Sequence, residues 1–206
     1  VIFYLLTIPS LTYIIGALAS GNPLASVGAS REIKLIISYE LTFLLFFAAI
    51  ILKADQTLRM SEIIQMQAQT SPFIGSLSGV LLFIVGVFGV QAKLGMVPFD
   101  IAEAETELSE GSFIEYSGTV YALVKLTKYI MLFILPALVV GFLMSGFHLE
   151  GLGILWAILK LLAVVLLLTL IRNTNPRLKI KQAMKFFLIG MNVLVILAIV
   201  LTYLGL

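Results

Sequence analysis

Long apolar runs separated by short polar connections set the pattern of this sequence. A helix needs about 20 mostly apolar residues to cross the hydrocarbon core of a bilayer. These runs are continuous and lack the period-two alternation of outer-membrane strands, so they predict helices. Six segments qualify, at roughly 1–19, 33–53, 73–93, 117–144, 152–171 and 185–206. We therefore expect an all-α, polytopic membrane helix bundle in which residues 1–206 form a single membrane domain.

The connection at 54–72 has a different pattern from the runs around it. Its apolar residues Met60, Ile63, Ile64 and Met66 recur at helical spacing between polar ones. This spacing predicts a short amphipathic helix on the outer surface of the bundle, with a structural role.

Composition supports a membrane protein and limits its chemistry. Hydrophobic residues make up 61% of the chain and charged residues 12%, against about 45–50% and about 25% in soluble domains. There is no cysteine, and the single histidine, His148, lies in a polar turn. The chain therefore has no thiolate ligand for an iron–sulfur cluster and no histidine cluster for a metal or haem. We expect no cofactor in this chain, and any redox cofactor to belong to a partner.

The basic residues are distributed unevenly between the two sets of connections. With six spans, the connections near 20–32, 94–116 and 172–184 share one side, and those near 54–72 and 145–151 share the other. The first side carries eight Lys and Arg residues at or near its span ends, and the second carries two, Lys53 and Arg59. Because cytoplasmic loops carry the excess of Lys and Arg, this asymmetry predicts that the first side is cytoplasmic.

An acidic stretch, residues 95–118, lies on that predicted cytoplasmic side. It contains six of the 11 acidic residues of the chain: Asp100, Glu103, Glu105, Glu107, Glu110 and Glu115. Pro98 and Phe99 end the preceding helix, and Asp100 can cap a new one with Glu103 three residues on. Glu103, Glu107 and Glu110 would then share a helix face. Two interpretations remain open: a proton relay folded back into the bundle, or a solvated acidic helix.

Four charged residues fall inside predicted spans. Glu40 lies about two turns into its apolar run, Lys125 and Lys128 share a face of the fourth span, and Lys160 lies near the middle of the fifth. Ionisable residues inside a membrane are costly and are functional candidates by default, so these four predict an ion or proton pathway. The alternatives are an ion pair of Glu40 with Lys34 or a neighbouring helix, and lysines that snorkel to the interface.

The last cytoplasmic connection, RNTNPRLKIKQAMKF, is compact and basic. It could meet anionic lipid or an acidic partner surface, or act only as a topology signal. Together with Arg31 at the mouth of the second span, its residues are candidates for docking a partner: Arg172, Arg177, Lys179 and Lys181.

Three ordered motifs resemble one known family, the heel subunit of respiratory complex I and its relatives, the membrane anchors of energy-converting nickel–iron hydrogenases. They are GASREIKLIISYE, PFDIAEAETEL with the following EYSG, and RNTNPR followed by a Gln-x-Met pair. The family fold has eight transmembrane helices, and the motifs align the first span here with the family's third. Val1 begins inside an apolar run without the basic region of a signal peptide. We therefore expect the family's first two helices to be missing from this sequence.

The resemblance implies a charge-pathway role for the acids. In the family, the carboxylates that match Glu40, Glu103, Glu105, Glu107, Glu110 and Glu115 lie in a water-filled passage linking redox chemistry to ion pumping. Arg31 and Asp100 match further polar positions of that region. One departure concerns the early fourth span, where complex I members tend to have Leu-x-Glu-Tyr and this chain has Leu126-Thr127-Lys128-Tyr129. A second is Met96-Val97 before the Pro-Phe-Asp, where an arginine is frequent. Both departures are more typical of the hydrogenase branch, which needs no quinone.

The function that the resemblance implies is a non-redox anchor and ion-pathway subunit in the plasma membrane of a prokaryote. The expected partners are peripheral-arm subunits with iron–sulfur clusters and a nickel–iron centre, antiporter-like membrane subunits and lipid, with no nucleic acid. The alternatives are the quinone-site subunit of a complex I-type dehydrogenase, and a stand-alone secondary transporter, which should show an inverted repeat.

Overall fold

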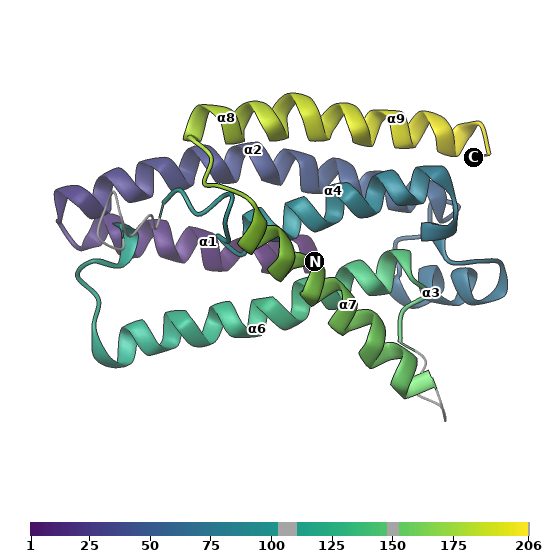
Figure 1. Cartoon of the computed structure of the whole chain (residues 1–206), viewed down its shortest axis with the longest axis horizontal. Helices are drawn as coiled ribbons and strands as arrows, with labels where there is room; N and C mark the ends of the chain where they lie inside the picture. The colour runs from purple at the N-terminus through teal and green to yellow at the C-terminus, as the bar shows by residue number, and fades with distance from the viewer. Residues whose placement is uncertain (103–110, 148–152, 206) are drawn as a thin grey trace.

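Apolar helices that run side by side along the long axis of the molecule dominate the fold (Figure 1). The structure is a computed structural model that describes residues 1–102, 111–147 and 153–205, without the side chain of Phe3. No strand occurs within these ranges. The elements are α1 (Ile2–Ala19), α2 (Pro23–Lys53), α3 (Met60–Gln69), the 3₁₀ turn η1 (Phe73–Gly75), α4 (Leu77–Lys93), the 3₁₀ turn η2 (Gly111–Phe113), α6 (Gly118–Leu143), α7 (Gly153–Thr174), α8 (Ile180–Lys185), the π-helical η3 (Phe186–Met191) and α9 (Asn192–Tyr203).

The all-α prediction is confirmed, and every predicted span corresponds to a helix. Four helical segments are long and apolar enough to cross a membrane: Pro23–Lys53, Gly118–Leu143, Gly153–Thr174 and Ile180–Tyr203. Two further apolar helices, Tyr4–Ala19 and Leu77–Lys93, are shorter. At 1.5 Å per residue, 17 residues span about 25 Å of a hydrocarbon core about 30 Å thick. The count of six crossings therefore stays a prediction.

The second helix starts earlier than the hydrophobic pattern predicted. The apolar run begins near residue 33, whereas α2 begins at Pro23, so most of the expected 20–32 connection is helical. The side chain of Asn22 accepts a hydrogen bond from the backbone N–H of Leu24 at 2.8 Å, and proline is favoured in the first helical turn. Its polar first turns extend α2 to 31 residues and carry Arg31 and Glu32.

Helix α2 is the central element, because it packs against α1, α4 and α9 (Figure 1). The segment before the acidic residues is tied to the far end of the chain. The Phe99 ring packs on Phe187 with centroids 4.8 Å apart, and the Leu178 N–H donates to the Pro98 carbonyl at 3.0 Å. These contacts join the 94–100 connection to the connection between α7 and α8. Ile101 and Ala102 are not helical, so the predicted helix does not begin directly after Asp100.

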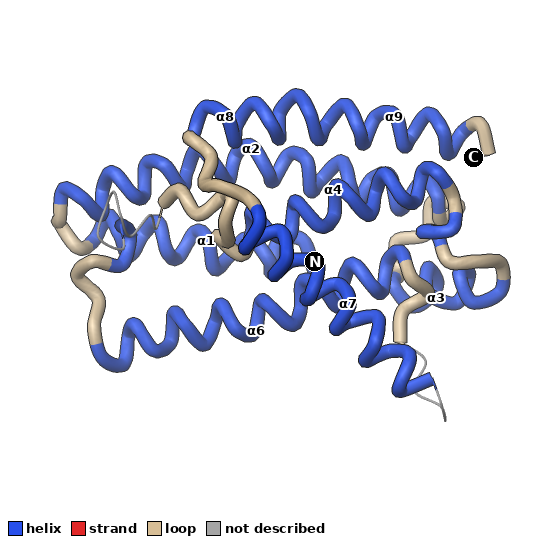
Figure 2. Tube along the Cα trace, in the orientation of Figure 1, coloured by secondary structure: helices blue, strands red, loops and turns tan. Residues whose placement is uncertain are grey.

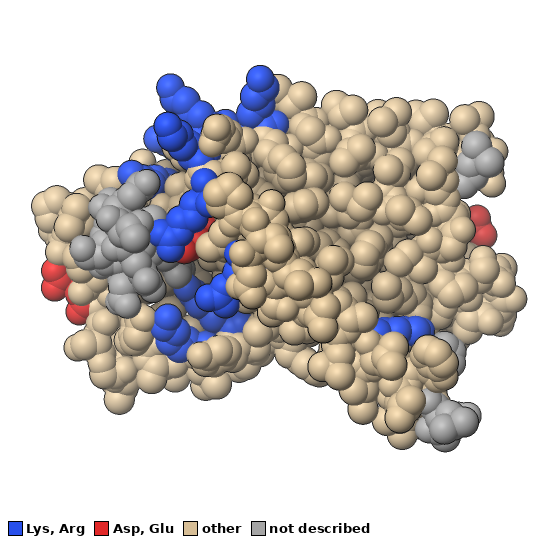
Figure 3. Space-filling model, viewed as in Figure 1, with Lys and Arg blue, Asp and Glu red and all other residues tan. Residues whose placement is uncertain are grey.

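The connections gather at two ends of the bundle, as the topology argument predicted (Figure 2). One end holds the α1–α2 turn, the chain around Asp100 and the α7–α8 connection; the other holds the α2–α3 and α6–α7 connections. On the face shown in Figure 3, most Lys and Arg side chains gather toward the first end. We refer to it below as the charged end.

At the opposite end, α3 forms where the amphipathic pattern predicted it, with Ile63 and Gln67 buried against the bundle. The Gln67 side chain donates to the Phe142 carbonyl at 3.0 Å and accepts from the Ser145 N–H at 2.9 Å. These bonds satisfy backbone groups where α6 ends, which is a structural role.

Gly28 lets the segment after the acidic residues approach α2. A Cβ atom at Gly28 would lie 2.8 Å from the backbone nitrogen of Ser112 and 3.1 Å from the Ala102 carbonyl oxygen.

We predict that Gly28→Ala destabilises the protein by about 1–3 kcal/mol, because backbone atoms must move to accept the methyl group. Thermal unfolding of the purified protein in detergent measures this. Gly75→Ala is the matched control, since nothing lies within 4 Å of its Cβ position; an equal loss in both variants would contradict the close-approach explanation.

Candidate functional site

A buried ion pair joins α2 to α4 near the charged end of the bundle. The Lys93 ammonium group donates to one carboxylate oxygen of Glu40. The Lys93 side chain has no exposed area, and the Glu40 side chain is 15% exposed. The lysine nitrogen also lies 5.5 Å from the ring centroid of Tyr39 and 5.1 Å from that of Phe43. The carboxylate and the two aromatic faces together offset the cost of removing the ammonium group from water.

Polar groups from α1 extend this site. Tyr39 is fully buried, and its hydroxyl shares a hydrogen bond of 3.2 Å with the hydroxyl of Ser10. Ser10 follows Pro9, which lies inside α1 and lacks the N–H that a helix residue normally donates. The second carboxylate oxygen of Glu40 is buried and has no hydrogen-bond partner among the described residues. That oxygen is an acceptor available to a water molecule or a proton.

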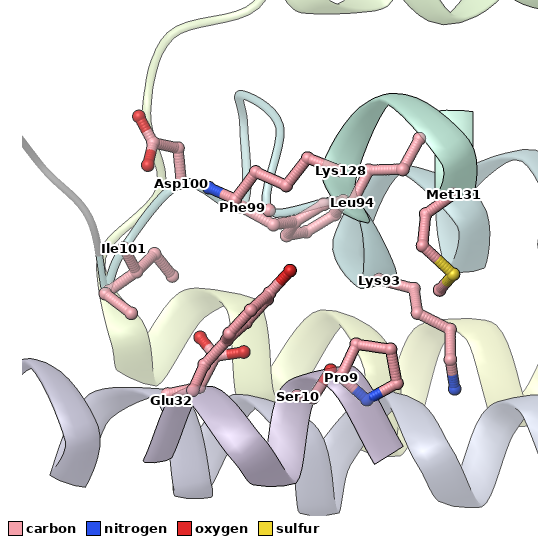
Figure 4. A pocket seen from close by; sticks show the side chains of 13 residues that line it. Pro9, Ser10, Glu32, Lys93, Leu94, Phe99, Asp100, Ile101, Lys128 and Met131 are labelled. Atoms are coloured by element: carbon pink, nitrogen blue, oxygen red, sulfur yellow. The ribbon is translucent and has the colours of Figure 1, made fainter. Parts of the chain in front are cut away.

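A small polar cavity connects this ion pair to the charged end (Figure 4). Its volume is about 20 Å³, which is enough for about one water, since a cavity needs roughly 10–15 Å³. Two acids and two lysines line it: Glu32, Lys93, Asp100 and Lys128. In Figure 4 the Lys128 side chain points toward Asp100, whereas the Lys93 nitrogen points away from it, deeper into the bundle. The cavity therefore brings together charges from α2, α4, α6 and the 94–102 connection.

A second, larger cavity adjoins the first; we call it the cationic cavity. Its volume is about 360 Å³, and it shares Leu94, Gly95, Asp100 and Lys128 with the small cavity. Lys125, Arg172 and Arg177 also line it, and one guanidinium nitrogen of Arg177 lies 3.1 Å from an Asp100 carboxylate oxygen. We call the charged side chains that line the two cavities, together with the Glu40–Lys93 pair at the inner end, the polar route.

The structure brings together only some of the residues that the sequence singled out. Glu40, Asp100, Lys128, Lys125, Arg172 and Arg177 lie along this route. Glu115 is exposed and accepts a hydrogen bond from the Asn22 side chain, and Lys160 donates to the Met144 carbonyl at the opposite end of α6, at 2.7 Å. Arg31 is half-buried on α2, while Lys179 at the start of α8 and Lys181 within α8 are exposed. The candidates Glu103, Glu105, Glu107 and Glu110 lie outside the described residues.

Lys93 is the main functional candidate that the sequence did not reveal as one. In the sequence it contributes only to the charge of the predicted cytoplasmic side, because a lysine at the end of an apolar run is typical of a membrane interface. The expected partner of Glu40 on its own helix, Lys34, is exposed, and the true partner comes from α4. Tyr39 was marked only by its place in the GASREIKLIISYE motif, and Ser10 gave no signal beyond being a polar residue in an apolar run.

Comparison with known proteins shows the relatives of this chain. Residues 1–203 match the family described as NADH dehydrogenase. A subunit of the NADH-quinone oxidoreductase of Phocaeicola vulgatus is 34% identical over 200 residues, which cover 88% of this chain and 55% of the relative. The corresponding subunit of Brevibacillus brevis is 33% identical over 174 residues, covering 82% and 51%. The chain thus spans about half the length of the curated relatives it matches.

The fold is also shared with a solved structure. A chain of the membrane-bound sulfane sulfur reductase, an archaeal respiratory membrane complex, superposes with a TM-score of 0.89 at 26% identity. The match covers 97% of this chain and 67% of that chain.

We predict that Lys93→Met destabilises the protein by about 3–5 kcal/mol, because it leaves the Glu40 carboxylate buried without its partner. The double variant Glu40→Gln, Lys93→Met should recover most of this loss, since neither residue then carries a charge. Thermal unfolding of both variants in detergent, compared in a double-mutant cycle, measures the coupling. Additive losses in the two single variants would show that the pair does not act as a unit.

Proposed function

This chain belongs to the NADH dehydrogenase family, and we propose that it is the non-redox membrane-anchor and ion-pathway subunit of an energy-converting, hydrogenase-like complex. In this proposal a peripheral arm with iron–sulfur clusters and a nickel–iron centre oxidises ferredoxin and reduces protons. The free energy of that reaction drives ion movement through the membrane arm. The relatives support a place in such an assembly, because they are named as oxidoreductase subunits and one is part of a respiratory membrane complex.

The observation that carries the proposal is the buried Glu40–Lys93 pair at the inner end of a polar route. The pair has no net charge. A proton added to Glu40 would give the pair a positive charge, and a charge placed in the adjoining cavity would change the electrostatic energy of its members. A carboxylate oxygen without a partner among the described residues can accept that proton. Charge arriving at Asp100 or Glu32 acts on Lys93 through the small cavity that all three line. The arrangement thus couples events at the charged end to a charge pair inside the membrane.

The charged end is the proposed docking surface for the peripheral arm. Lys179 at the start of α8 and Lys181 within α8 are exposed there, and Arg31, Arg172 and Arg177 belong to the same end. In this proposal that end faces the cytoplasm of a prokaryotic cell, and antiporter-like membrane subunits continue the ion pathway. The carboxylates of the acidic stretch that lie outside the described residues would complete the relay: Glu103, Glu105, Glu107 and Glu110.

The second candidate is a quinone-site subunit, which the names of the curated relatives favour. The lining of the larger cavity favours the first candidate. Its described lining includes four cations and one carboxylate, whereas a quinone is neutral and largely apolar and pockets for such ligands are mostly apolar with few polar groups.

Metal analysis of the complex purified with its native partners tests which branch is correct. We predict that the complex contains nickel and that a quinone-analogue inhibitor leaves hydrogen production from reduced ferredoxin unchanged. A complex without nickel whose electron transfer is blocked by the quinone analogue would instead identify the quinone-site subunit.

We predict that Glu40→Gln separates electron transfer from ion pumping while the complex still assembles, because the Gln amide oxygen can still accept from Lys93 but the amide cannot exchange a proton. Ion uptake into proteoliposomes, divided by the electron-transfer rate, should fall about tenfold or more, as for the removal of a proton-transfer group. Glu62→Gln is the matched control, since Glu62 pairs with Arg59 in an exposed position on α3. Unchanged pumping in Glu40→Gln would remove this residue from the pathway.

A further inference from the structure

We propose that the cationic cavity binds the phosphate-bearing headgroup of one anionic phospholipid. Its charged lining residues come from two helices and the two connections beside them: Lys125 and Lys128 from α6, Arg172 from α7, and Asp100 and Arg177 from the connections. Among the described residues, four cations and one acid line the cavity, so this part of the lining is positive. The Asp100 carboxylate pairs with Arg177, so it is already engaged with one of the four. A phosphate group is the anion that Lys and Arg side chains bind with charge-assisted hydrogen bonds.

The cavity has room for a headgroup. Its volume of about 360 Å³ far exceeds the roughly 10–15 Å³ that a cavity needs to hold one water. Arg172 makes no hydrogen bond or ion pair with residues 1–102, 111–147 or 153–205 in the structure. Its five N–H donors remain available for a bidentate contact with phosphate oxygens.

The surface beside the cavity identifies the anion as an amphiphile. Lys125, Tyr129 and Phe133 are spaced i, i+4 and i+8, so they follow one side of α6. Tyr129 lines the cavity and is 67% exposed, and Phe133 beyond it is 62% exposed. Along about 12 Å of helix, the side chains change from a cation to a tyrosine and then to an apolar ring. This is the order of headgroup, interface and acyl chains in a bilayer.

This gradient distinguishes a lipid from a free phosphate or a nucleotide. A soluble anion would contact the cations alone, whereas the apolar side of α6 beside them is a surface for acyl chains. A phospholipid uses both, with its phosphate among the cations and its acyl chains along Tyr129 and Phe133. Basic pockets between transmembrane helices are known to hold anionic headgroups in this way.

The test is lipid binding to the purified complex after delipidation in a neutral detergent. The probes are dioctanoyl phosphatidylglycerol, dioctanoyl phosphatidylcholine with the same chains and no net charge, and inorganic phosphate. Native mass spectrometry measures the dissociation constant of the tightest bound lipid. We expect phosphatidylglycerol to bind at least tenfold more tightly than phosphatidylcholine, and inorganic phosphate to compete only weakly.

Two variants place the binding in this cavity. Lys125→Gln and Arg172→Gln should each weaken phosphatidylglycerol binding by about tenfold, the loss expected for one hydrogen bond to a charged group. Lys185→Gln is the matched control, because Lys185 is an exposed cation of α8 outside the cavity lining. This variant should bind phosphatidylglycerol as tightly as the parent. If Arg172→Gln fails to assemble, Arg172→Lys keeps the charge but loses the bidentate contact, so it should weaken binding by less than about tenfold.

Several results would overturn the proposal. Equal binding of the two lipids would show that the cavity does not select a charged headgroup. Inorganic phosphate that competes as strongly as the lipid would identify a site for a soluble anion. An equal loss in Lys185→Gln would indicate a general surface attraction. Each experiment measures lipid binding and not turnover. Its outcome is therefore independent of whether the proposed role in ion pumping is correct.

Discussion

The ion pair between Glu40 and Lys93 is the interaction on which the rest of the site depends. A charge buried in a helix bundle is costly unless it is paired and its remaining hydrogen bonds are satisfied. The bundle meets this cost with a carboxylate from α2, an ammonium group from α4 and the aromatic faces of Tyr39 and Phe43. Because α2 also contacts α1 and α9, a change of the pair's charge acts on several helices.

Polar groups have different kinds of partners at the two ends of the bundle. At the end where α3 packs, neutral amide groups of Gln67 satisfy backbone atoms, and Lys160 satisfies the carbonyl of Met144. These are structural contacts with fixed partners. At the charged end, acids and bases face one another across cavities that can hold water or a ligand. Acids and bases that can exchange partners are suited to moving charge, which is the role proposed for this end.

The shared fold and the local chemistry carry different information. The chain superposes on a subunit of a sulfane sulfur reductase complex with a TM-score of 0.89, and its curated relatives are named as quinone oxidoreductase subunits. One fold therefore serves complexes with different electron acceptors, as is usual for membrane and soluble folds alike. In this chain Lys125, Lys128 and Arg172 line the larger cavity, which is the basis for proposing an anion over a neutral ligand there.

The sequence by itself determined the helical class, the two groups of connections, the short amphipathic helix α3 and Glu40 as a candidate. These follow from local patterns: apolar run length, charge near span ends and a charged residue within an apolar run. Tertiary structure alone decided that Lys93 pairs with Glu40, 53 positions away, and that Lys160 caps α6 instead of joining the other lysines. It also placed Arg172 and Lys125 around one cavity. Such pairings depend on how helices pack and rotate against one another, which no period or spacing within a single helix encodes.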